Sequence, residues 1–305
     1  MHHLFIHVEF TGELSQVHRT KYLGRVIMPD VTAADVKALR ERTDLPMMEC
    51  KRALVEADGD ADKAVEILKK QFKKIQDKRS ENATEEGRIF IAITEDRSEA
   101  AMIEIQCESA PVATGEALEA LGTAAVNQLL NGPGADSPEA LMSQTPEGSS
   151  QSLQDLYEDF VNKIREKTVV VRIDRVAGPA GGYVHHDFKT GVVFQAKGEA
   201  KNPEILRDVA MHIAALKPVC CHAEELDAAI VEAERNTHSE AARASGKPEQ
   251  IIDKIVDGQM KKFFAEKGVL LYQPFAKDDK KSVQQVLTEN NLEAVGFNRW
   301  KVGIA

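Results

Sequence analysis

The chain has 305 residues, 43% of them hydrophobic, which is enough for two modest hydrophobic cores with accessory helices. Its formal net charge of −10 disfavours a nucleic-acid-binding protein, because binding to phosphates requires clustered lysine and arginine. No apolar run approaches the about 20 residues that are needed to span a membrane.

The four cysteines are Cys50, Cys107, Cys220 and Cys221, and their spacing is irregular. This usage is typical of proteins in a reducing cytosol. Cys220-Cys221-His222 lacks the Cys-x-x-Cys spacing of a metal site. We therefore predict neither a bound metal nor a cofactor.

Residues 1–28 contain four of the nine histidines and scattered apolar residues without a sustained period. They lack the basic segment followed by an apolar segment that marks a signal peptide, and Glu9 and Glu13 argue against a mitochondrial transit peptide. We predict a leader without fixed structure, non-native or misassigned, with Met28 as a plausible start codon.

Residues 29–72 predict a module of three short helices. Thr32 is a good N-cap for the first helix. This helix should stop near Thr43, because Asp44-Leu45-Pro46 interrupts the pattern and Pro46 suits the first position of a second helix.

The second helix is predicted to run from Met47 to about Asp58, and Gly59 can take the left-handed conformation that ends it. Asp60 then caps the third helix. Apolar residues recur at helical spacing along these two helices, at Cys50, Ala53, Leu54, Ala57, Ala61, Ala64, Val65 and Leu68.

Met47 and Met48 stand at the joint between the first two helices and allow two interpretations. Methionine readily fills a core, and it also forms soft exposed surfaces that bind a partner. Arg40 and Lys51 are either solvated charges on helix faces or part of such a surface. The residues alone do not decide between these alternatives.

Residues 73–86 predict a tether, in which a basic helical tail ending at Arg79 precedes polar residues. Residues 87–130 predict a β-hairpin followed by an alanine-rich helix. Residues 131–152 are rich in glycine, proline and serine, which favours a loop between two halves.

Residues 153–221 repeat this plan. The predicted elements are a strand, a hairpin and a covering helix, at residues 168–173, 182–186 with 191–196, and 203–216. Two such units predict a duplicated α+β core. His185 and His186 fall on the first predicted strand of the hairpin. They are either ordinary strand residues with satisfied hydrogen bonds or residues that contact a partner protein.

Residues 222–265 predict a helical hairpin, because Gly246 stops one helix and Pro248 opens the next. The second helix is too apolar to stand alone, so it needs a partner helix or the core. Residues 266–305 form the C-terminal segment. The predicted fold class is α+β: a three-helix module, a duplicated hairpin-plus-helix core, and a helical hairpin inserted before the C-terminal segment.

Motifs of catalysis are missing from the sequence. It contains no Gly-x-x-x-x-Gly-Lys-Ser/Thr, no Gly-x-Ser-x-Gly and no His-Glu-x-x-His. A glycine-rich run from Gly178 to Gly182 is explained by a loop between strands. We therefore predict a protein that is not an enzyme and that uses its polar residues to bind a protein surface.

Several motifs occur in a fixed order along the chain: Leu39-Arg40-x-Arg42-Thr43, Met47-Met48-x-Cys50-Lys51-Arg52-Ala53-Leu54, Gly59-Asp60-x-x-x-Ala64, Tyr183-x-His185, Ala210-Met211-His212-Ile213-Ala214-Ala215-x-Lys217-Pro218, Lys261-Lys262-Phe263 with Gln273-Pro274-Phe275, and Val295-Gly296-Phe297-x-Arg299-x-x-Val302-Gly303. In this order they resemble the elongation factor Ts family, the guanine-nucleotide exchange factors of elongation factor Tu. The resemblance covers about residues 30 to 303.

The resemblance implies a fold like the ubiquitin-associated (UBA) domain for the three-helix module and elongation factor Tu as the partner. The residues that match the family's partner contacts are Arg40, Met47, Met48, Lys51 and His185. It further implies release of GDP so that GTP can rebind, by disruption of magnesium and phosphate contacts in the partner. The expected location is the cytoplasm, and no direct nucleic-acid or membrane partner is expected. The resemblance is compatible with an assembly of two copies of this chain and two of Tu.

One segment departs from the family. After Cys107 the family has Gln-Thr-Asp-Phe-Val, whose aspartate and phenylalanine are credited with displacing the partner's magnesium; this chain has Glu108, Ser109, Ala110, Pro111 and Val112. Ala110 has no carboxylate, and Pro111 has neither an aromatic ring nor an N–H donor. We expect the segment to keep the place of the exchange loop without its chemistry.

Three functions follow from these observations. The chain is an elongation factor Ts with an altered exchange loop, or a Tu-binding holdase or stabiliser with weak exchange activity. A ubiquitin-associated-type adaptor is the third, although it needs nothing from residues 87–303. Acceleration of GDP release from the cognate Tu separates the first two.

Overall fold

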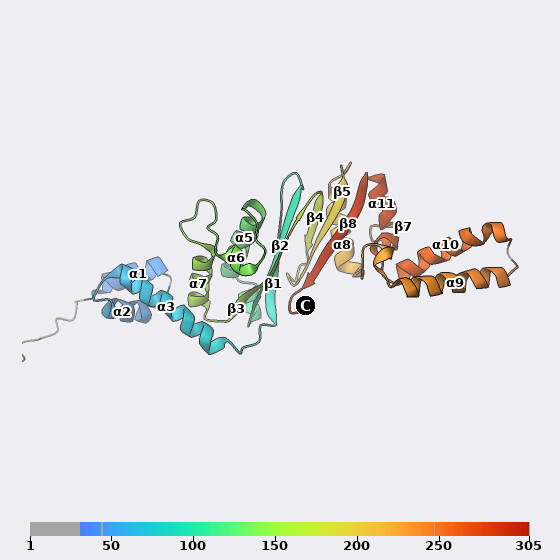
Figure 1. Cartoon of the computed structure of the whole chain (residues 1–305). Coiled ribbons are helices and arrows are strands. Elements are labelled where there is room, and N and C mark those ends of the chain that lie inside the picture. Colours follow the sequence, from blue (N-terminus) through green and yellow to red (C-terminus); the bar gives the residue numbers. More distant parts are fainter. Residues whose placement is uncertain (1–30, 44, 247, 305) are drawn as a thin grey trace, which may run out of the picture. The chain divides into compact units, whose positions relative to one another are not determined.

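The computed structural model of the chain describes residues 31–43, 45–246 and 248–304. These residues form two compact units, of which the first ends at Leu68 and the second begins at Lys69. The predicted leader and Asp44 lie outside the described residues. Figure 1 shows helices and antiparallel strands in the α+β arrangement that the sequence predicted.

In the described part of the first unit, three helices follow one another: α1 (Ala33–Thr43), α2 (Met47–Glu56) and α3 (Ala61–Arg79), which continues into the second unit. The Thr32 hydroxyl accepts a hydrogen bond from the Asp35 amide at 3.2 Å. The Asp35 carboxylate accepts one from the Thr32 amide at 2.9 Å. This reciprocal pair satisfies donors that the helix leaves free, so the predicted cap is confirmed.

The ends of α2 and the start of α3 depend on short-range signals. Pro46 precedes α2 as its N-cap, one position earlier than predicted, and α2 ends two residues before the expected end. Gly59 has a φ of 84°, a conformation that glycine adopts without a steric penalty. The Asp60 carboxylate accepts hydrogen bonds from two amides in the first turn of α3, both at 3.0 Å.

A closed hydrophobic cluster holds the helices of this first unit together. Its buried members are Val36, Leu39, Leu45, Cys50, Ala53, Leu54, Ala57, Ala64 and Leu68. The inward face predicted from helical spacing is therefore confirmed at Cys50, Ala53, Leu54, Ala57, Ala64 and Leu68, and Val65 is partly buried against it, but the prediction is wrong for Ala61, which is exposed.

Among the described residues, the second unit contains two antiparallel three-stranded sheets. The strand orders are β1-β2-β3 and β4-β5-β8. Their bounds are β1 (Glu86–Ile93), β2 (Glu99–Cys107), β3 (Thr168–Ala177), β4 (Ala180–Val184), β5 (Thr190–Gly198) and β8 (Leu292–Lys301). One prediction is wrong here: β3, assigned from the sequence to the second half, pairs with β2 in the first sheet.

Helices cover the outer faces of the two sheets (Figure 1). The helices packed against the first sheet are α5 (Glu116–Asn131), α6 (Pro138–Met142) and α7 (Leu153–Ile164), and those against the second are α8 (Glu204–Leu216) and α11 (Val283–Glu289). The segment predicted as a loop at 131–152 thus contains a short helix, α6, whose proline stands in its first turn.

The inner faces of the two sheets pack against each other. The cluster between them includes Ile89, Ala100, Met102, Ala180, Val193 and Val302. A Cβ added to Gly191 would lie 2.4 Å from the Ile89 side chain, so a glycine is needed for this close approach. Strand β2 is consequently buried on both faces, with alternate residues directed to α5 and to the second sheet.

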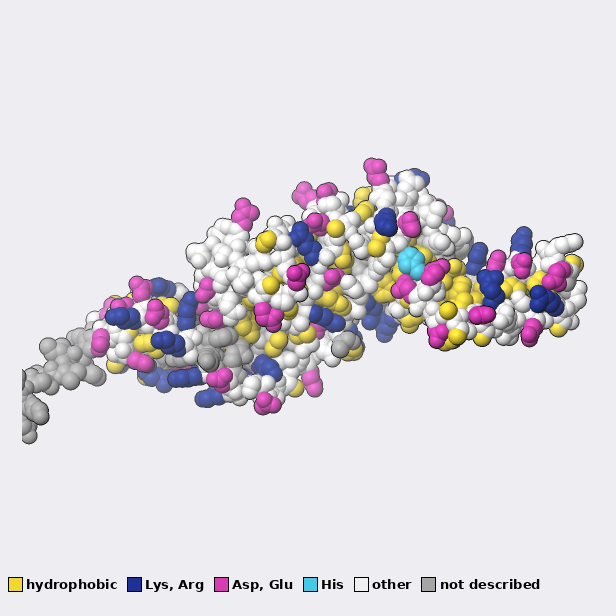
Figure 2. All heavy atoms as spheres, viewed as in Figure 1, with side chains coloured by type: hydrophobic (Ala, Val, Ile, Leu, Met, Phe, Trp, Pro, Cys, Tyr) yellow, Lys and Arg dark blue, Asp and Glu magenta, His cyan; other side chains and the backbone are white. Residues whose placement is uncertain are grey.

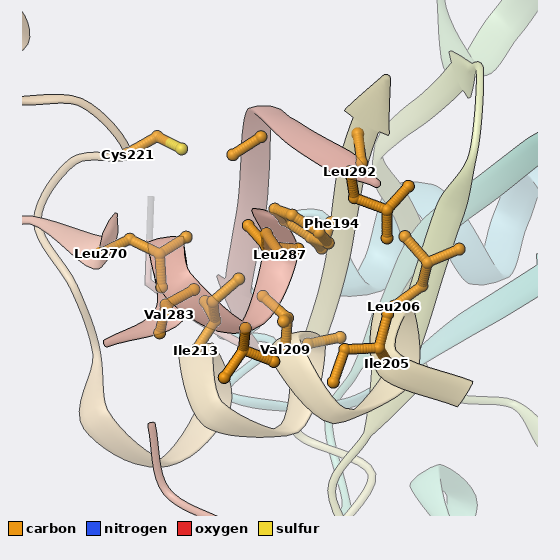
Figure 3. Packing of buried hydrophobic residues seen from close by; sticks show 14 of the residues in the cluster. Phe194, Ile205, Leu206, Val209, Ile213, Cys221, Leu270, Val283, Leu287 and Leu292 are labelled. Carbon is orange, nitrogen blue, oxygen red and sulfur yellow. The ribbon is translucent and has the colours of Figure 1, made fainter. Parts of the chain in front are cut away.

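A large hydrophobic cluster lies between the second sheet and its helices (Figure 3). Phe194 of β5 is fully buried among Val209 and Ile213 of α8 and Leu287 of α11. This packing fixes the position of α8 on the sheet, and with it the position of Lys217, which directly follows the helix.

A helical hairpin formed by α9 (Ala228–Ala244) and α10 (Glu249–Glu266) precedes the C-terminal segment (Figure 1). Gly246 has a φ of 72° and Pro248 is the N-cap of α10, as the sequence predicted. The remaining elements are α4 (Ala110–Ala113), β6 (Pro274–Phe275), β7 (Asp278–Ser282) and two short 3-10 helices (Ala223–Glu225, Leu270–Tyr272). None of the helices described is both long and apolar enough to cross a membrane.

Candidate functional site

The first turn of α2 presents two large apolar side chains to solvent. Met47 is 52% exposed and Met48 is 63% exposed, whereas Cys50 and Leu54 of the same helix are 0% and 1% exposed. The core of the module is therefore complete without the methionines. The core-filling interpretation is wrong, and the contact interpretation stays a prediction.

Two cations accompany the methionines in the helical module. Lys51 follows Met47 by four residues and Met48 by three, a spacing that places all three on one side of α2. Arg40 is exposed in the last turn of α1. We call Arg40, Met47, Met48 and Lys51 the module surface.

Several other cations of the module form ion pairs with carboxylates. Arg42 forms an ion pair with Asp62 at 2.7 Å, and Lys37 pairs with Glu41 at 3.7 Å. Within the part of the module that the structure describes, neither Arg40 nor Lys51 has a carboxylate partner. Both heads are thus available to a partner protein without breaking an existing pair.

The segment Ser109–Val112, which we call the exchange loop, follows the buried end of β2. It is not a simple turn: Ser109 is the N-cap of the short helix α4, and its carbonyl accepts a hydrogen bond from the Ala113 amide at 3.1 Å. The Ser109 hydroxyl donates to the Glu166 carboxylate at 2.9 Å. Ala110 and Pro111 are exposed at the tip.

Val112 differs from the two residues before it because it packs against the cluster beneath α5. The loop is therefore anchored on one side by an apolar contact and on the other by the Ser109 hydrogen bonds. Its exposed tip carries only a methyl group and a pyrrolidine ring, so it has a fixed place but little reach.

Glu108 fastens the start of this loop to two distant segments. Its carboxylate accepts hydrogen bonds from Arg79 and Asn82, each at 2.7 Å, and from the Lys167 amide. Burial acts to raise the pKa of Glu108, but these hydrogen bonds and the Arg79 charge outweigh it and lower the pKa. The carboxylate is therefore ionised and bound at neutral pH.

His185 lies in the turn between β4 and β5, not on the strand that the sequence predicted. Its amide donates to the Thr190 carbonyl at 2.8 Å, and its Nδ1 lies 3.1 Å from the Tyr183 hydroxyl. The ring is thus oriented by Tyr183. His186 is exposed, and the two imidazole centroids are 4.1 Å apart.

A cavity of about 430 Å³ opens beside His185. Its lining comes from β4, the following turn, α8 and β8, and the residues are Tyr183, His185, Asp187, Thr190, Met211, Ala214, Ala215, Lys217, Arg299 and Lys301. The sequence motifs contain His185, Lys217 and Arg299, but sequence reasoning gave a role only to His185 and did not single out Lys301. Their shared location is not a local property, because the pairing of β8 with β5 brings Arg299 and Lys301 to this cavity and the packing of α8 on the sheet brings Lys217.

The thiols of Cys107 and Cys221 are poor nucleophiles. All four cysteines are free and buried. Burial raises the pKa of Cys107 to about 11 and that of Cys221 to about 12, so both remain protonated thiols at neutral pH. The described residues also hold no group of three or more His, Cys, Asp or Glu side chains that could bind a metal.

Charges of both signs are interspersed over the face of the molecule drawn in Figure 2. Such mixing gives no large field of one sign and so agrees with specific protein contacts at a few positions. The predicted site residues lie in three parts of the chain: the module surface on α1 and α2, the exchange loop after β2, and His185 with its cavity.

Comparison with known proteins gives a consistent result. The family profile described as "Elongation factor TS" matches residues 111–304. Elongation factor Ts of Renibacterium salmoninarum is 40% identical over 284 residues, covering 90% of this chain and 100% of the relative. Elongation factor Ts of Thiobacillus denitrificans is 39% identical over 278 residues, covering 90% and 93%. That of Thioalkalivibrio sulfidiphilus is 36% identical over 276 residues, covering 90% and 92%.

Proposed function

Because the chain belongs to the elongation factor Ts family, the nucleotide exchange factors of elongation factor Tu, we propose that it binds Tu through the module surface and acts on nucleotide release through the exchange loop and His185. The chain itself supplies no catalytic chemistry. Exposure of Met47 and Met48 outside a complete core is the observation that carries the proposal. Large apolar side chains on a helix surface gain free energy when a partner covers them.

Exchange follows from binding by thermodynamic linkage. If the chain binds nucleotide-free Tu more tightly than Tu-GDP, it must weaken GDP binding by the same factor. Couplings of this kind typically amount to about 1–3 kcal/mol, or roughly 5- to 150-fold. We propose that the chain reaches this coupling by disturbing the magnesium and phosphate contacts of its partner.

A second function is favoured by the exchange loop. Its tip residues, Ala110 and Pro111, are exposed but short, and an inserted phenylalanine would bury far more area. A chain that binds Tu but has no large side chain to insert from the exchange loop would act as a holdase or stabiliser with weak exchange activity. The two functions share the module surface and differ in the loop.

One experiment separates them. The cognate Tu is loaded with a fluorescent GDP analogue, and its release is followed by stopped flow at fixed magnesium with increasing amounts of the chain. Acceleration that saturates with the chain supports the exchange factor. Binding that is measurable by titration without acceleration supports the stabiliser, and absence of binding overturns both.

Two further points belong to the proposal. We propose that the chain acts in the cytoplasm, where free thiols such as its four cysteines persist. We also propose a 2:2 assembly with Tu. Light scattering of the purified complex tests this stoichiometry, because a 1:1 complex has half the mass.

A further inference from the structure

The cavity beside His185 gathers positive charge in a chain that is acidic overall. Lys217 ends α8, while Arg299 and Lys301 lie on β8. Residues two apart on a strand point to the same face, so both β8 cations face the cavity. The three cations outnumber the single carboxylate of the lining, Asp187, which accepts a hydrogen bond from the Lys189 amide at 2.9 Å. We call this cavity the basic pocket.

Cations just outside the basic pocket are satisfied within the chain. Lys189 pairs with Glu86 at 2.6 Å, and Arg172 pairs with Glu104 at 2.7 Å. In the part of the chain that the structure describes, Lys217, Arg299 and Lys301 have no such ion pair. For Arg299 the difference is not explained by exposure, because the side chains of Lys189 and Arg299 are both partly buried, whereas Lys217 and Lys301 are exposed.

The guanidinium of Arg299 adds a second observation. Its Nε is buried and has no hydrogen-bond partner among the described residues. A buried donor without a partner costs free energy, and an incoming acceptor would recover it. Arginine offers a planar set of donors that matches a carboxylate in two-point geometry.

We propose that the basic pocket binds an acidic side chain of elongation factor Tu, held by Arg299 between Lys217 and Lys301. The inference rests on the proposed function, since His185 lines the same cavity and is a predicted contact residue. His185 is oriented by Tyr183 through Nδ1, which leaves its other nitrogen for the partner. The occupant is thus a carboxylate on a protein surface that also reaches the turn between β4 and β5.

The test measures the affinity of the full chain for its cognate Tu, with the wild type, a Lys217→Gln/Lys301→Gln double variant and a triple variant that adds Arg299→Gln. Exposed ion pairs each change affinity by up to about fivefold. We therefore expect about 2- to 25-fold weaker binding for the double variant and a further loss for the triple variant. The salt dependence of binding should also become shallower, because salt screens the removed attraction.

Arg207→Gln is the matched control. Arg207 is exposed on α8 and lies ten residues before Lys217, or roughly 15 Å along a helix. Its loss removes the same charge from the same helix without touching the basic pocket. We expect wild-type affinity and salt dependence for this variant. Thermal unfolding of every variant shows whether Arg299→Gln alters folding, and the double variant tests the pocket without that change.

The outcomes are distinct. Unchanged affinity and salt dependence in both pocket variants, with a wild type that binds Tu, overturn the basic pocket and leave the proposed function intact. Equal weakening by Arg207→Gln also overturns it, because the effect would then reflect net charge. A wild type that does not bind Tu overturns the proposed function itself. If free inorganic phosphate competes with Tu for the pocket at submillimolar concentration, the site selects phosphate and the proposal of a protein carboxylate is wrong.

Discussion

The module surface and the exchange loop begin in similar ways and end differently. In both, a proline stands at the start of a helix: Pro46 caps α2, and Pro111 lies in the first turn of α4. After Pro46 come two methionines that are more than half exposed. The tip of α4 exposes only Ala110 and Pro111 itself. The start of α2 therefore exposes large flexible side chains, whereas the start of α4 exposes only a small and rigid surface.

This difference separates affinity from exchange. Apolar area covered on binding contributes about 25 cal/mol per Å², whichever nucleotide state the partner is in. Only interactions that differ between the two states of Tu can shift its nucleotide equilibrium. The module surface can thus supply affinity, while the exchange loop has to supply the difference. Variants of each region should affect one property without the other.

The largest effect is expected from a change that destroys the module itself. Leu54 is 1% exposed in the core of the first unit, so Leu54→Ala should cost about 2–5 kcal/mol of stability through lost contacts and a cavity. Chemical denaturation followed by circular dichroism measures this loss. If Leu54→Ala unfolds as the wild type does, the buried side of α2 has been misassigned and the contrast with the methionines fails.

Local signals in the sequence predicted the module well. Thr32, Gly59 and Asp60 act within a few residues of where they stand, through hydrogen bonds and backbone conformations that depend on neighbouring positions. Gly246 and Pro248 bounded the two helices of the hairpin in the same way. The sequence does not decide whether Met47 and Met48 are buried or exposed, because helical spacing alone does not distinguish a core methionine from a surface methionine.

Non-local features could not be predicted in this way. Strand β3 joins the first sheet by pairing with β2, across about 60 residues of intervening chain, and no local pattern indicates that choice. His185 was expected on a strand and lies in a turn. The basic pocket depends on elements far apart in the chain, so the motifs that contain Lys217 and Arg299 do not show that these two cations share a cavity with Lys301.

A smaller but more specific effect is expected from the methionines. Met47→Ala with Met48→Ala should weaken Tu binding by about 2 kcal/mol, or roughly 30-fold, as residues that dominate an interface do. Stability should change by less than about 0.5 kcal/mol, because both side chains are exposed. Titration calorimetry with Tu and denaturation of the same samples measure the two quantities. A large loss of stability with unchanged affinity would contradict the module surface.

Giving the exchange loop the aspartate and phenylalanine of the family should change the rate of GDP release more than the affinity for Tu. Ala110→Asp with Pro111→Phe gives the exchange loop a carboxylate and an aromatic ring at exposed positions. We expect GDP release to accelerate about tenfold, which corresponds to about 1.4 kcal/mol, while affinity for nucleotide-free Tu stays similar. An aspartate near the start of α4 should not harm the helix.

The control for this variant is Ala110→Asn with Pro111→Ala, which removes the proline without adding charge or ring. Stopped-flow release of a fluorescent GDP analogue compares the two variants with the wild type. If the wild type already accelerates GDP release from Tu as much as the Ala110→Asp/Pro111→Phe variant does, the exchange loop is only a turn between β2 and α5. Nucleotide release would then depend on the module surface and His185.

The smallest effect concerns the anchor of the exchange loop. Glu108 binds Arg79, Asn82 and the Lys167 amide, and Glu108→Gln removes the charge while keeping the size of the side chain. A hydrogen bond of this kind contributes about 1 kcal/mol, so the variant should lose about that much stability at neutral pH. Because the pKa of Glu108 is lowered by folding, protonation of the unfolded chain comes first as the pH falls.

The stability supplied by Glu108 is therefore complete above its ordinary pKa of 4.5 and is lost as the pH falls through the lower pKa of the folded chain. Urea unfolding of the wild type and Glu108→Gln at several pH values should show a gap that is widest near neutrality and narrows in acid. Glu95→Gln, a change in the exposed turn between β1 and β2, should show no such gap. A constant gap across this range would mean that Glu108 acts by packing and not by charge. The position of the exchange loop would then be set by Val112 and the Ser109 hydrogen bonds alone.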